Sequence, residues 1–366
     1  MYFTFRNFWR AYHFTKCVMT PRKISRVRIT EFNKIMYMNS PQVYIKAPAR
    51  LHLGFLDLEG SLGRRFGSLG LTLDGIATRI VARRDSHFNV LGKPDERVVK
   101  LAERFFEIKG LPGGCEIEVL EQIPAHSGLG SGTQLALAVG TAISKLYSLG
   151  FSCEDIAVTL DRGKRSGVGI GAFQHGGFLL DAGKNQSNFI PPIVSRIAFP
   201  SKWRVVLIMD SASHGLYGDD ESTSFSSLPP VSSDIASYLC RLTLMQIMPA
   251  VSEQDLGTFS KGIHDLQRCM SDFFASQQGG RYTSHVVGDA IGYIESLGIK
   301  GVGQSSWGPI GFAFVGSEEQ ALVLLRALQE EFRKKKELQF KIVSGRNTGA
   351  VVQQQGTVSL PAAAKF

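Results

Sequence analysis

A glycine-rich loop that runs directly into an apolar helix constrains the fold of this chain more than any other segment. Residues 124–150 read PAHSGLGSGTQLALAVGTAISKLYSLG, with Gly128, Gly130 and Gly132 within five positions. The part from Gln134 to Leu149 is apolar almost all round, which predicts a buried helix. Glycines let a backbone approach a ligand closely, and free N–H groups at a helix start attract an anion. The segment therefore predicts a phosphate-binding loop.

The side chains of this loop limit the kinds of ligand that we expect it to bind. Ser131 and Thr133 add hydroxyl donors, and His126 adds a ring donor. A Walker loop is excluded because no Gly-Lys-Ser/Thr follows, and Thr133 stands where a dinucleotide fingerprint needs its third glycine. A tight strand-to-helix turn is the alternative, although three glycines in five residues exceed what a turn needs. We expect phosphate binding without NAD.

The net charge of the 366-residue chain, +9, is concentrated at its start. Residues 1–40 hold eight basic residues and one acid, a net charge of +7, which leaves +2 for the rest. This placement argues against nucleic acid as a partner. We interpret residues 1–40 as a basic extension that is disordered or precedes the native start, since Met36 and Met38 lie just before the first strand. A transit-type or surface-binding segment and a nucleic-acid-binding arm are the alternatives.

The spacing of the cysteines and the hydropathy of the chain indicate which cellular compartment and which cofactors to expect. The five cysteines lie far apart and form no Cys-x-x-Cys pair, which fits neither a disulfide framework nor a zinc site. No apolar run approaches 18 residues, so we expect no membrane span. We predict a cytoplasmic protein without zinc, NAD or PLP.

The remaining pattern predicts two α+β domains, at residues 41–195 and 200–348, followed by a loose tail at 349–366. The first strand is interrupted at Pro48, and a polar stretch at 211–233 reads as a long loop. Strands are predicted at 43–47, 77–82, 116–121, 178–180, 205–209, 311–315 and 340–343. Helices are predicted at 95–109, 134–149, 235–247, 254–274 and 284–297. Two more helices are predicted, one after an N-cap at Ser152 and one after a capping box formed by Ser317 and Gln320.

Three motifs carry a resemblance to a known superfamily. Pro124-x3-Gly128-Leu129-Gly130-Ser131-Gly132-Thr133 resembles the phosphate-binding motif of the GHMP superfamily of small-molecule kinases. KAPARLHLGFLDL, at 46–58, is similar to the N-terminal motif, and GVGQSSWGP, at 301–309, stands in the place of the C-terminal glycine motif. The resemblance implies a mixed α/β N-terminal domain and a ferredoxin-like α+β C-terminal domain.

Five collinear motifs narrow the resemblance to the β-ribofuranosylaminobenzene 5′-phosphate synthases of methanopterin biosynthesis. The motifs are APARLHLGFLD, IPAHSGLGSGTQ, RSGVGIGAFQHGGFLLD, HGLYGDDE and GQSSWGP. That family joins phosphoribosyl pyrophosphate to 4-aminobenzoate or 4-hydroxybenzoate, with loss of pyrophosphate and CO2. The resemblance implies these small-molecule partners, Mg2+ and a homodimer; the sequence does not choose between the two acids.

Two departures from the kinases favour a synthase. In sugar and mevalonate-type kinases the Ser-Gly after the second helix precedes an Asp base, whereas Gly169 follows Ser166-Gly167-Val168 here. Residues 304–307 also replace expected glycines with Gln-Ser-Ser-Trp. An ATP-dependent kinase is the first alternative, and a non-catalytic phosphometabolite-binding protein is the second.

The resemblance and the residue chemistry together give a set of expected site residues. Arg50 would pair bidentately with phosphate or carboxylate, Asp57 would hold Mg2+ or orient ribose, and Trp307 would stack on the benzoate ring. The expected catalytic residues are Arg50, His52, Asp57, His175 and Glu221. The expected phosphate-binding residues are Gly128, Leu129, Gly130, Ser131, Gly132, Thr133 and Arg165. The expected substrate-binding residues are Gln174, His214, Gln304, Ser305 and Trp307.

Overall fold

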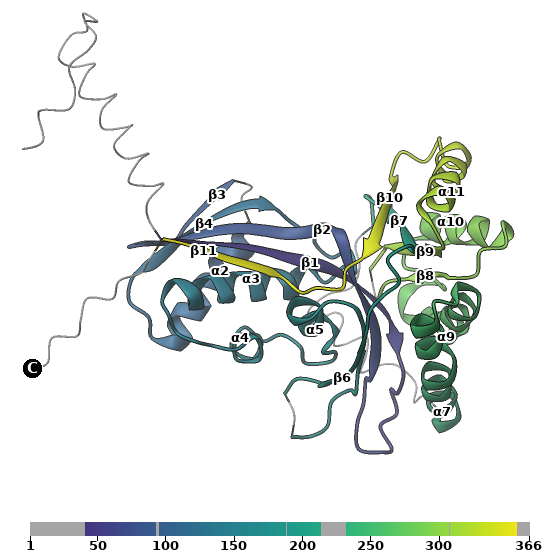
Figure 1. Cartoon of the computed structure of the whole chain (residues 1–366), viewed down its shortest axis with the longest axis horizontal. Helices are drawn as coiled ribbons and strands as arrows, with labels where there is room; N and C mark the ends of the chain where they lie inside the picture. Colours follow the sequence, from purple (N-terminus) through teal and green to yellow (C-terminus); the bar gives the residue numbers. More distant parts are fainter. Residues whose placement is uncertain (1–40, 93–94, 188, 214–231, 307, 357–366) are drawn as a thin grey trace, which may run out of the picture.

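The computed structural model describes residues 41–92, 95–187, 189–213, 232–306 and 308–356. Residues 1–40 and the expected site residues His214, Glu221 and Trp307 lie outside these ranges. Within them the chain forms two α+β domains that lie side by side (Figure 1). This agrees with the predicted fold class.

The first domain is built on a mostly antiparallel sheet that helices cover on one face (Figure 1). Its strands are β1 (Gln42–Phe55), β2 (Ser68–Asp85), β3 (Asn89–Gly92), β4 (Gly114–Glu121), β5 (Phe178–Asp181), β6 (Ile193–Ile197) and β11 (Val351–Gln355). Its helices are α2 (Glu96–Lys109), α3 (Ser131–Leu146), α4 (Cys153–Thr159) and α5 (Val168–Gln174). Helix α3 is buried on nearly every side, as predicted.

The second domain has the strand order β10-β7-β9-β8, all antiparallel. This is the ferredoxin-like order that the resemblance implies. Its strands are β7 (Arg204–Asp210), β8 (Val302–Gln304), β9 (Gly311–Val315) and β10 (Leu338–Gly345). Its helices are α7 (Ser233–Leu242), the π-helical turn η1 (Thr243–Ile247), α8 (Met248–Glu253), α9 (Leu256–Gln278), α10 (His285–Ser296) and α11 (Glu318–Glu331).

Strand β2 belongs to both domains. Its pairing with β1 moves from Pro48↔Ala77 to Arg50↔Thr72, so between these pairs β2 has four residues, 73–76, where β1 has one, Ala49. The segment that bulges out pairs instead with β10, at Leu73↔Gly345. A proline has no N–H to donate to the ladder, so Pro48 suits this irregularity. The predicted interruption at Pro48 is a bulge within one continuous strand.

Alternating side chains of β7 divide the core of the second domain. Val206 and Ile208 pack with α10 and α11, whereas Val205 and Leu207 pack in a cluster that includes Leu53 of β1 and Leu266 of α9. The latter cluster therefore crosses from one domain to the other. A shared core of this kind holds β1 against α9, and the candidate site lies there.

Several helix ends follow the predicted capping chemistry. Asp95 caps α2, Gly110 ends it in the left-handed region, and Ser152 and Asp155 form a complete capping box. Ser317 caps α11, but the Gln320 side chain accepts the N–H of Gly316 rather than that of Ser317. The capping box predicted for Ser317 and Gln320 is therefore incomplete.

The prediction of a loose tail at 349–366 is wrong for its first part. Val351–Gln355 pairs antiparallel with β1, from Lys46↔Val351 to Gln42↔Gln355. The Gln side chains are exposed, so no hydrophobic pattern marked the strand. Backbone hydrogen bonds to an otherwise uncovered sheet edge hold it in place.

Candidate active site

The predicted phosphate-binding loop connects β4 to α3. Gly128 has φ 85° and Gly130 has φ 81°, conformations that favour glycine. Gly130 is the N-cap of α3 and offers no side-chain acceptor. The first N–H groups of a helix have no acceptor within it, so the amides of Ser131, Gly132 and Thr133 form an anion-binding end.

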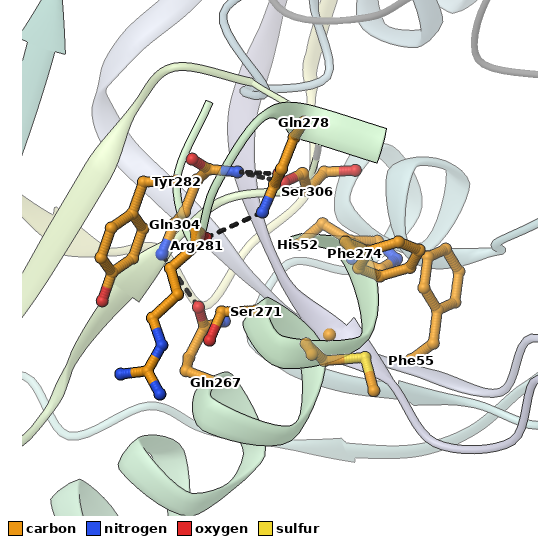
Figure 2. A pocket seen from close by; sticks show the side chains of 12 residues that line it. His52, Phe55, Gln267, Ser271, Phe274, Gln278, Arg281, Tyr282, Gln304 and Ser306 are labelled. Atoms are coloured by element: carbon orange, nitrogen blue, oxygen red, sulfur yellow. Dashed lines mark hydrogen bonds between the residues drawn. The ribbon is translucent and has the colours of Figure 1, made fainter. Parts of the chain in front are cut away.

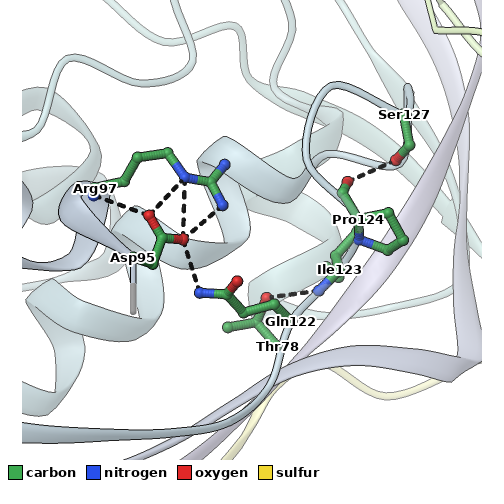
Figure 3. A network of polar contacts seen from close by, with 7 residues as sticks. All are labelled: Thr78, Asp95, Arg97, Gln122, Ile123, Pro124 and Ser127. Atoms are coloured by element: carbon green, nitrogen blue, oxygen red, sulfur yellow. Dashed lines mark hydrogen bonds and ion pairs between the residues drawn. The ribbon is translucent and has the colours of Figure 1, made fainter. Parts of the chain in front are cut away.

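A polar network fixes the entry to this loop (Figure 3). Asp95, the N-cap of α2, pairs with Arg97 and accepts a hydrogen bond of 2.8 Å from the Gln122 side chain. The next residue, Ile123, donates its N–H to the hydroxyl of Thr78 on β2 at 3.4 Å. The loop therefore begins from a point held by both a helix and the sheet.

The loop is held on its other side by the segment after β8. The Ser305 hydroxyl donates to the Gly128 carbonyl at 2.7 Å and accepts the His52 N–H at 3.0 Å. Gly308 lies so close to Gly128 that a Cβ on either residue would collide with backbone. Ser305, an expected substrate-binding residue, thus connects the loop to β1.

Arg50 lies along the same loop, as expected. Its guanidinium donates to the Gly128 carbonyl, its N–H donates to the Leu129 carbonyl at 3.1 Å, and its side chain lies against Gly130. The structure therefore brings together Arg50 and the glycine loop, two elements of different motifs.

Arg162 is a further cation at this loop, and the sequence reasoning missed it. A Cβ built on Gly132 would lie 3.6 Å from its Nη1 atom, which places the guanidinium beside the start of α3. Its Nε atom is buried and has no hydrogen-bond partner in the described part of the chain. Burial lowers the pKa of Arg162, Asp161 opposes this, and the charges of Arg104 and Arg97 lower it further. Arginine stays charged in proteins, so this charge adds to the helix end. The available signal was the basic stretch 162–165, which holds Arg162, Lys164 and Arg165, although only Arg165 was among the expected site residues.

His52 is buried beneath the same region, with 3% of its surface exposed. Neither ring nitrogen has a hydrogen-bond partner in the part of the chain that the structure describes. Burial, and secondly the charge of Arg50, lower the pKa of His52 to about 3. The imidazole is therefore neutral near pH 7.

His52 lines a pocket between β1 and the C-terminal part of α9 (Figure 2). Gln304, another expected site residue, also lines it; its side chain accepts the N–H of Thr283 at 2.8 Å and donates to the Ser306 carbonyl at 3.1 Å. The full lining is His52, Gly54, Phe55, Gln267, Met270, Ser271, Phe274, Gln278, Arg281, Tyr282, Gln304 and Ser306. Most of the α9 residues belong to no motif.

The second glycine cluster contacts the phosphate loop without supplying a carboxylate. A Cβ on Gly169 would lie 3.1 Å from the Thr133 side chain, so the position of the kinase base adjoins the loop. The nearby Asp181 is fully buried and accepts hydrogen bonds from the hydroxyls of Ser68 and Ser166 and the N–H groups of Gly167 and Gly183. Its oxygens are occupied by structural donors.

Some expected residues lie away from this cluster. Gln174 and His175 stand at the far end of α5, a helix about 10 Å long, and the Gln174 side chain donates to Glu154 at 2.7 Å. Asp57 accepts the turn N–H groups of Glu59 and Gly60 with one carboxylate oxygen, and it lines a different pocket. These positions give no support to the roles predicted for them. Arg165 lies in the loop between Arg162 and Ser166.

No group of three His, Cys, Asp or Glu side chains within the described ranges is placed to hold a metal ion. No helix in those ranges is long and apolar enough to cross a membrane.

Comparison with known protein families assigns the fold and the glycine loop to one superfamily. Residues 96–177 match the GHMP kinases N terminal domain, and residues 247–334 match the GHMP kinases C terminal family. The chain is 33% identical over 333 residues to the β-ribofuranosylphenol 5′-phosphate synthase of Archaeoglobus fulgidus, covering 84% of this chain and 99% of that protein. This chain belongs to the GHMP kinase superfamily.

Two further comparisons agree with this assignment, one in sequence and one in fold. The protein of the same name from Methanocaldococcus jannaschii is 35% identical over 251 residues, covering 61% of this chain and 76% of that one. The crystal structure of homoserine kinase from Cytophaga hutchinsonii has a TM-score of 0.58 at 18% identity, covering 85% of this GHMP chain and 97% of that one. At that identity the second likeness concerns the fold alone.

Proposed function

We propose that this GHMP-superfamily chain is a synthase that condenses phosphoribosyl pyrophosphate with 4-hydroxybenzoate or 4-aminobenzoate, as a step toward methanopterin. One observation carries the proposal: the anion-binding loop is intact between Arg50 and Arg162, while the adjoining position of the kinase base is Gly169. The name of the archaeal relatives, β-ribofuranosylphenol 5′-phosphate synthase, agrees with it.

The reaction needs no enzymatic carboxylate base. The ring carbon that bears the carboxylate forms a bond to ribose C1, and the C1–oxygen bond breaks with its electron pair leaving on pyrophosphate. CO2 then departs, and the electron pair of its carbon–carbon bond restores the aromatic ring. No proton is transferred in either step, so Gly169 is compatible with this chemistry.

The charges at the loop support such a reaction. The amides at the start of α3 and the Arg162 guanidinium favour the phosphate groups of the substrate and the negative charge that grows on the leaving pyrophosphate. Arg50 holds the loop through the Gly128 carbonyl, so the donors are arranged before the substrate binds. Preorganised charge of this kind lowers the barrier without a covalent intermediate.

The predicted Mg2+ remains part of the proposal. Within the described ranges no three candidate ligands gather. Asp57, the residue expected to hold the metal, uses one oxygen to accept two turn amides.

The test is release of labelled CO2 from carboxyl-labelled 4-hydroxybenzoate or 4-aminobenzoate, with phosphoribosyl pyrophosphate and Mg2+. We expect release that depends on both substrates and produces pyrophosphate in equal amount. Absence of release with either acid, together with ATP turnover on a small alcohol, would replace the synthase with a kinase. Tight binding of phosphoribosyl pyrophosphate without either reaction would indicate a binding protein.

A further inference from the structure

The pocket in Figure 2 is formed by both domains. His52 and Phe55 come from β1 of the first domain, and Met270 and Phe274 come from α9 of the second. The pocket adjoins the phosphate loop, because the His52 N–H binds the Ser305 hydroxyl, which in turn binds the Gly128 carbonyl. A molecule in this pocket would lie beside a molecule bound at the loop.

The walls of the pocket are largely aromatic, but its free volume of about 30 Å³ is room for about two water molecules, so an aromatic ring enters only when flexible side chains such as Met270 move aside. The Phe55 ring lies 4.6 Å from the His52 ring and 6.4 Å from the Phe274 ring, between centroids. Met270 and Tyr282 add a thioether and a further ring to the lining. Aromatic rings and methionine sulfur pack well against another aromatic ring.

The unpaired His52 imidazole points to a polar group on that ring. A buried polar group without a hydrogen bond is destabilising by about 1–3 kcal/mol, and the two His52 ring nitrogens have no partner among the described residues. A ligand that supplies a hydrogen bond would remove this penalty. Because the imidazole is neutral, it suits an uncharged hydroxyl or amino group better than a carboxylate.

Arg281 supplies a charge suited to a carboxylate. Its Nε atom pairs with Asp272 at 3.1 Å, but the Arg281 side chain is 60% exposed, and such surface pairs contribute little stability. Arg281 is one of the residues that line the pocket, and its long side chain can turn toward a bound anion. A planar carboxylate matches its fork of N–H donors.

We propose that this pocket binds the aromatic acid, with His52 hydrogen-bonded to the uncharged substituent para to the carboxylate and Arg281 paired with the carboxylate. The inference rests on the proposed function and deepens it. A hydroxyl both donates and accepts, so it matches either tautomer of His52, whereas a ring-bound amino group mainly donates. The pocket therefore favours 4-hydroxybenzoate over 4-aminobenzoate.

Two His52 variants test the hydrogen bond. In His52→Phe both nitrogens are lost, and we expect the KM for 4-hydroxybenzoate to rise about tenfold, the equivalent of one lost hydrogen bond. His52→Gln keeps a donor and an acceptor, so its KM should stay within about threefold of wild type. The preference for the hydroxy acid should shrink in the Phe variant only, and the KM for phosphoribosyl pyrophosphate should not move.

Arg281 gives a test that does not disturb the core, since its side chain is exposed. Arg281→Ala should raise the KM for either acid about tenfold and leave the KM for phosphoribosyl pyrophosphate unchanged. Arg333→Ala is the matched control, because Arg333 is about equally exposed and, within the described ranges, forms its ion pair with the nearby Glu330. Arg281→Lys should recover part of the loss.

The outcomes separate this inference from the proposed function. If the wild-type enzyme releases no CO2 from either acid, the proposed function fails and the pocket assignment fails with it. If the wild-type enzyme is active but Arg281→Ala and His52→Phe keep normal KM values for the acid, the pocket assignment alone is wrong. Calorimetric titration of 4-hydroxybenzoate against benzoate gives a readout without turnover: equal affinities would contradict the role of His52.

Discussion

At the scale of single residues, the site combines a charged loop with one neutral imidazole. Arg50 and Arg162 lie against the glycines, and His52 lies below them without a partner for its ring among the described residues. The low pKa of His52 has a consequence for stability. A histidine that stays neutral when folded opposes protonation, so acid favours the unfolded chain.

We therefore expect an acid-dependent loss of stability that His52 causes. Unfolded, His52 binds a proton below its ordinary pKa of 6.5, but folded it does so only near 3. The contribution is complete above about pH 6.5 and falls toward pH 3, with a limiting slope of about 1.4 kcal/mol per pH unit. Urea unfolding at several pH values should show that the gap in unfolding free energy, wild type minus His52→Gln, falls on acidification between about pH 6.5 and pH 5. A gap that stays constant would contradict the shifted pKa.

The glycine loop gives a second prediction, with a control in the same domain. Gly130→Ala forces a left-handed alanine, which is destabilising by about 1–2 kcal/mol, and its Cβ would lie 3.2 Å from the Arg50 side chain. We expect the KM for phosphoribosyl pyrophosphate to rise at least about tenfold, since the donors move. Gly150→Ala shares the positive φ but has open space around it. Equal KM values in the two variants would remove Gly130 from the phosphate site.

The loop could be predicted from the sequence because its residues are contiguous. The residues that pack against it from distant parts of the chain could not be predicted in this way. Ser131 and Gly132 are adjacent in the chain, so their spacing alone predicts an anion site. Arg162 reaches Gly132 only through the packing of α4 and α5 on α3, and no motif marks it. The pocket residues Met270 and Phe274 look like ordinary core positions of an amphipathic helix.

At the scale of elements, periodicity predicted the long helices, but it missed the short helix α5 and the strands β3, β6, β8 and β11, and it interrupted β1 at Pro48. Helix α2 buries one apolar face and helix α3 is buried on nearly every side, so the spacing of their apolar residues predicts both helices. Strand β1 continues past Pro48 because β2 bulges toward β10, a partner far away in the sequence. Strand β11 exposes its glutamines and depends on backbone pairing with β1, which side-chain patterns do not encode.

Removal of β11 should therefore destabilise the first domain. A chain that lacks residues 351–366 loses five paired positions along β1, and we expect a loss of about 2–5 kcal/mol in unfolding free energy from the lost hydrogen bonds. The uncovered edge should also promote association, visible by light scattering. A chain that lacks only residues 357–366 is the control. Equal stability of the two shortened chains would show that β11 contributes nothing.

At the scale of the whole molecule, most of the net positive charge and the residues of the proposed reaction lie in different parts of the chain. The +7 of residues 1–40 lies outside the described ranges, and each proposed contact begins at Arg50 or later. We expect a chain that begins at Met38 to keep the full rate of CO2 release. A loss of activity at equal thermal stability would show that the basic segment takes part in the reaction.

The two domains share strand β2 and a core cluster, and the last described strand completes the first domain's sheet. During synthesis on the ribosome, the first domain's residues emerge long before their final neighbour, β11. Until then the edge of β1 stays bare, and the second domain's sheet has no β10 to meet β2. The order of synthesis is thus opposed to the order of assembly. Nascent chains of this protein would depend on protection of that edge until the C-terminal residues leave the exit tunnel.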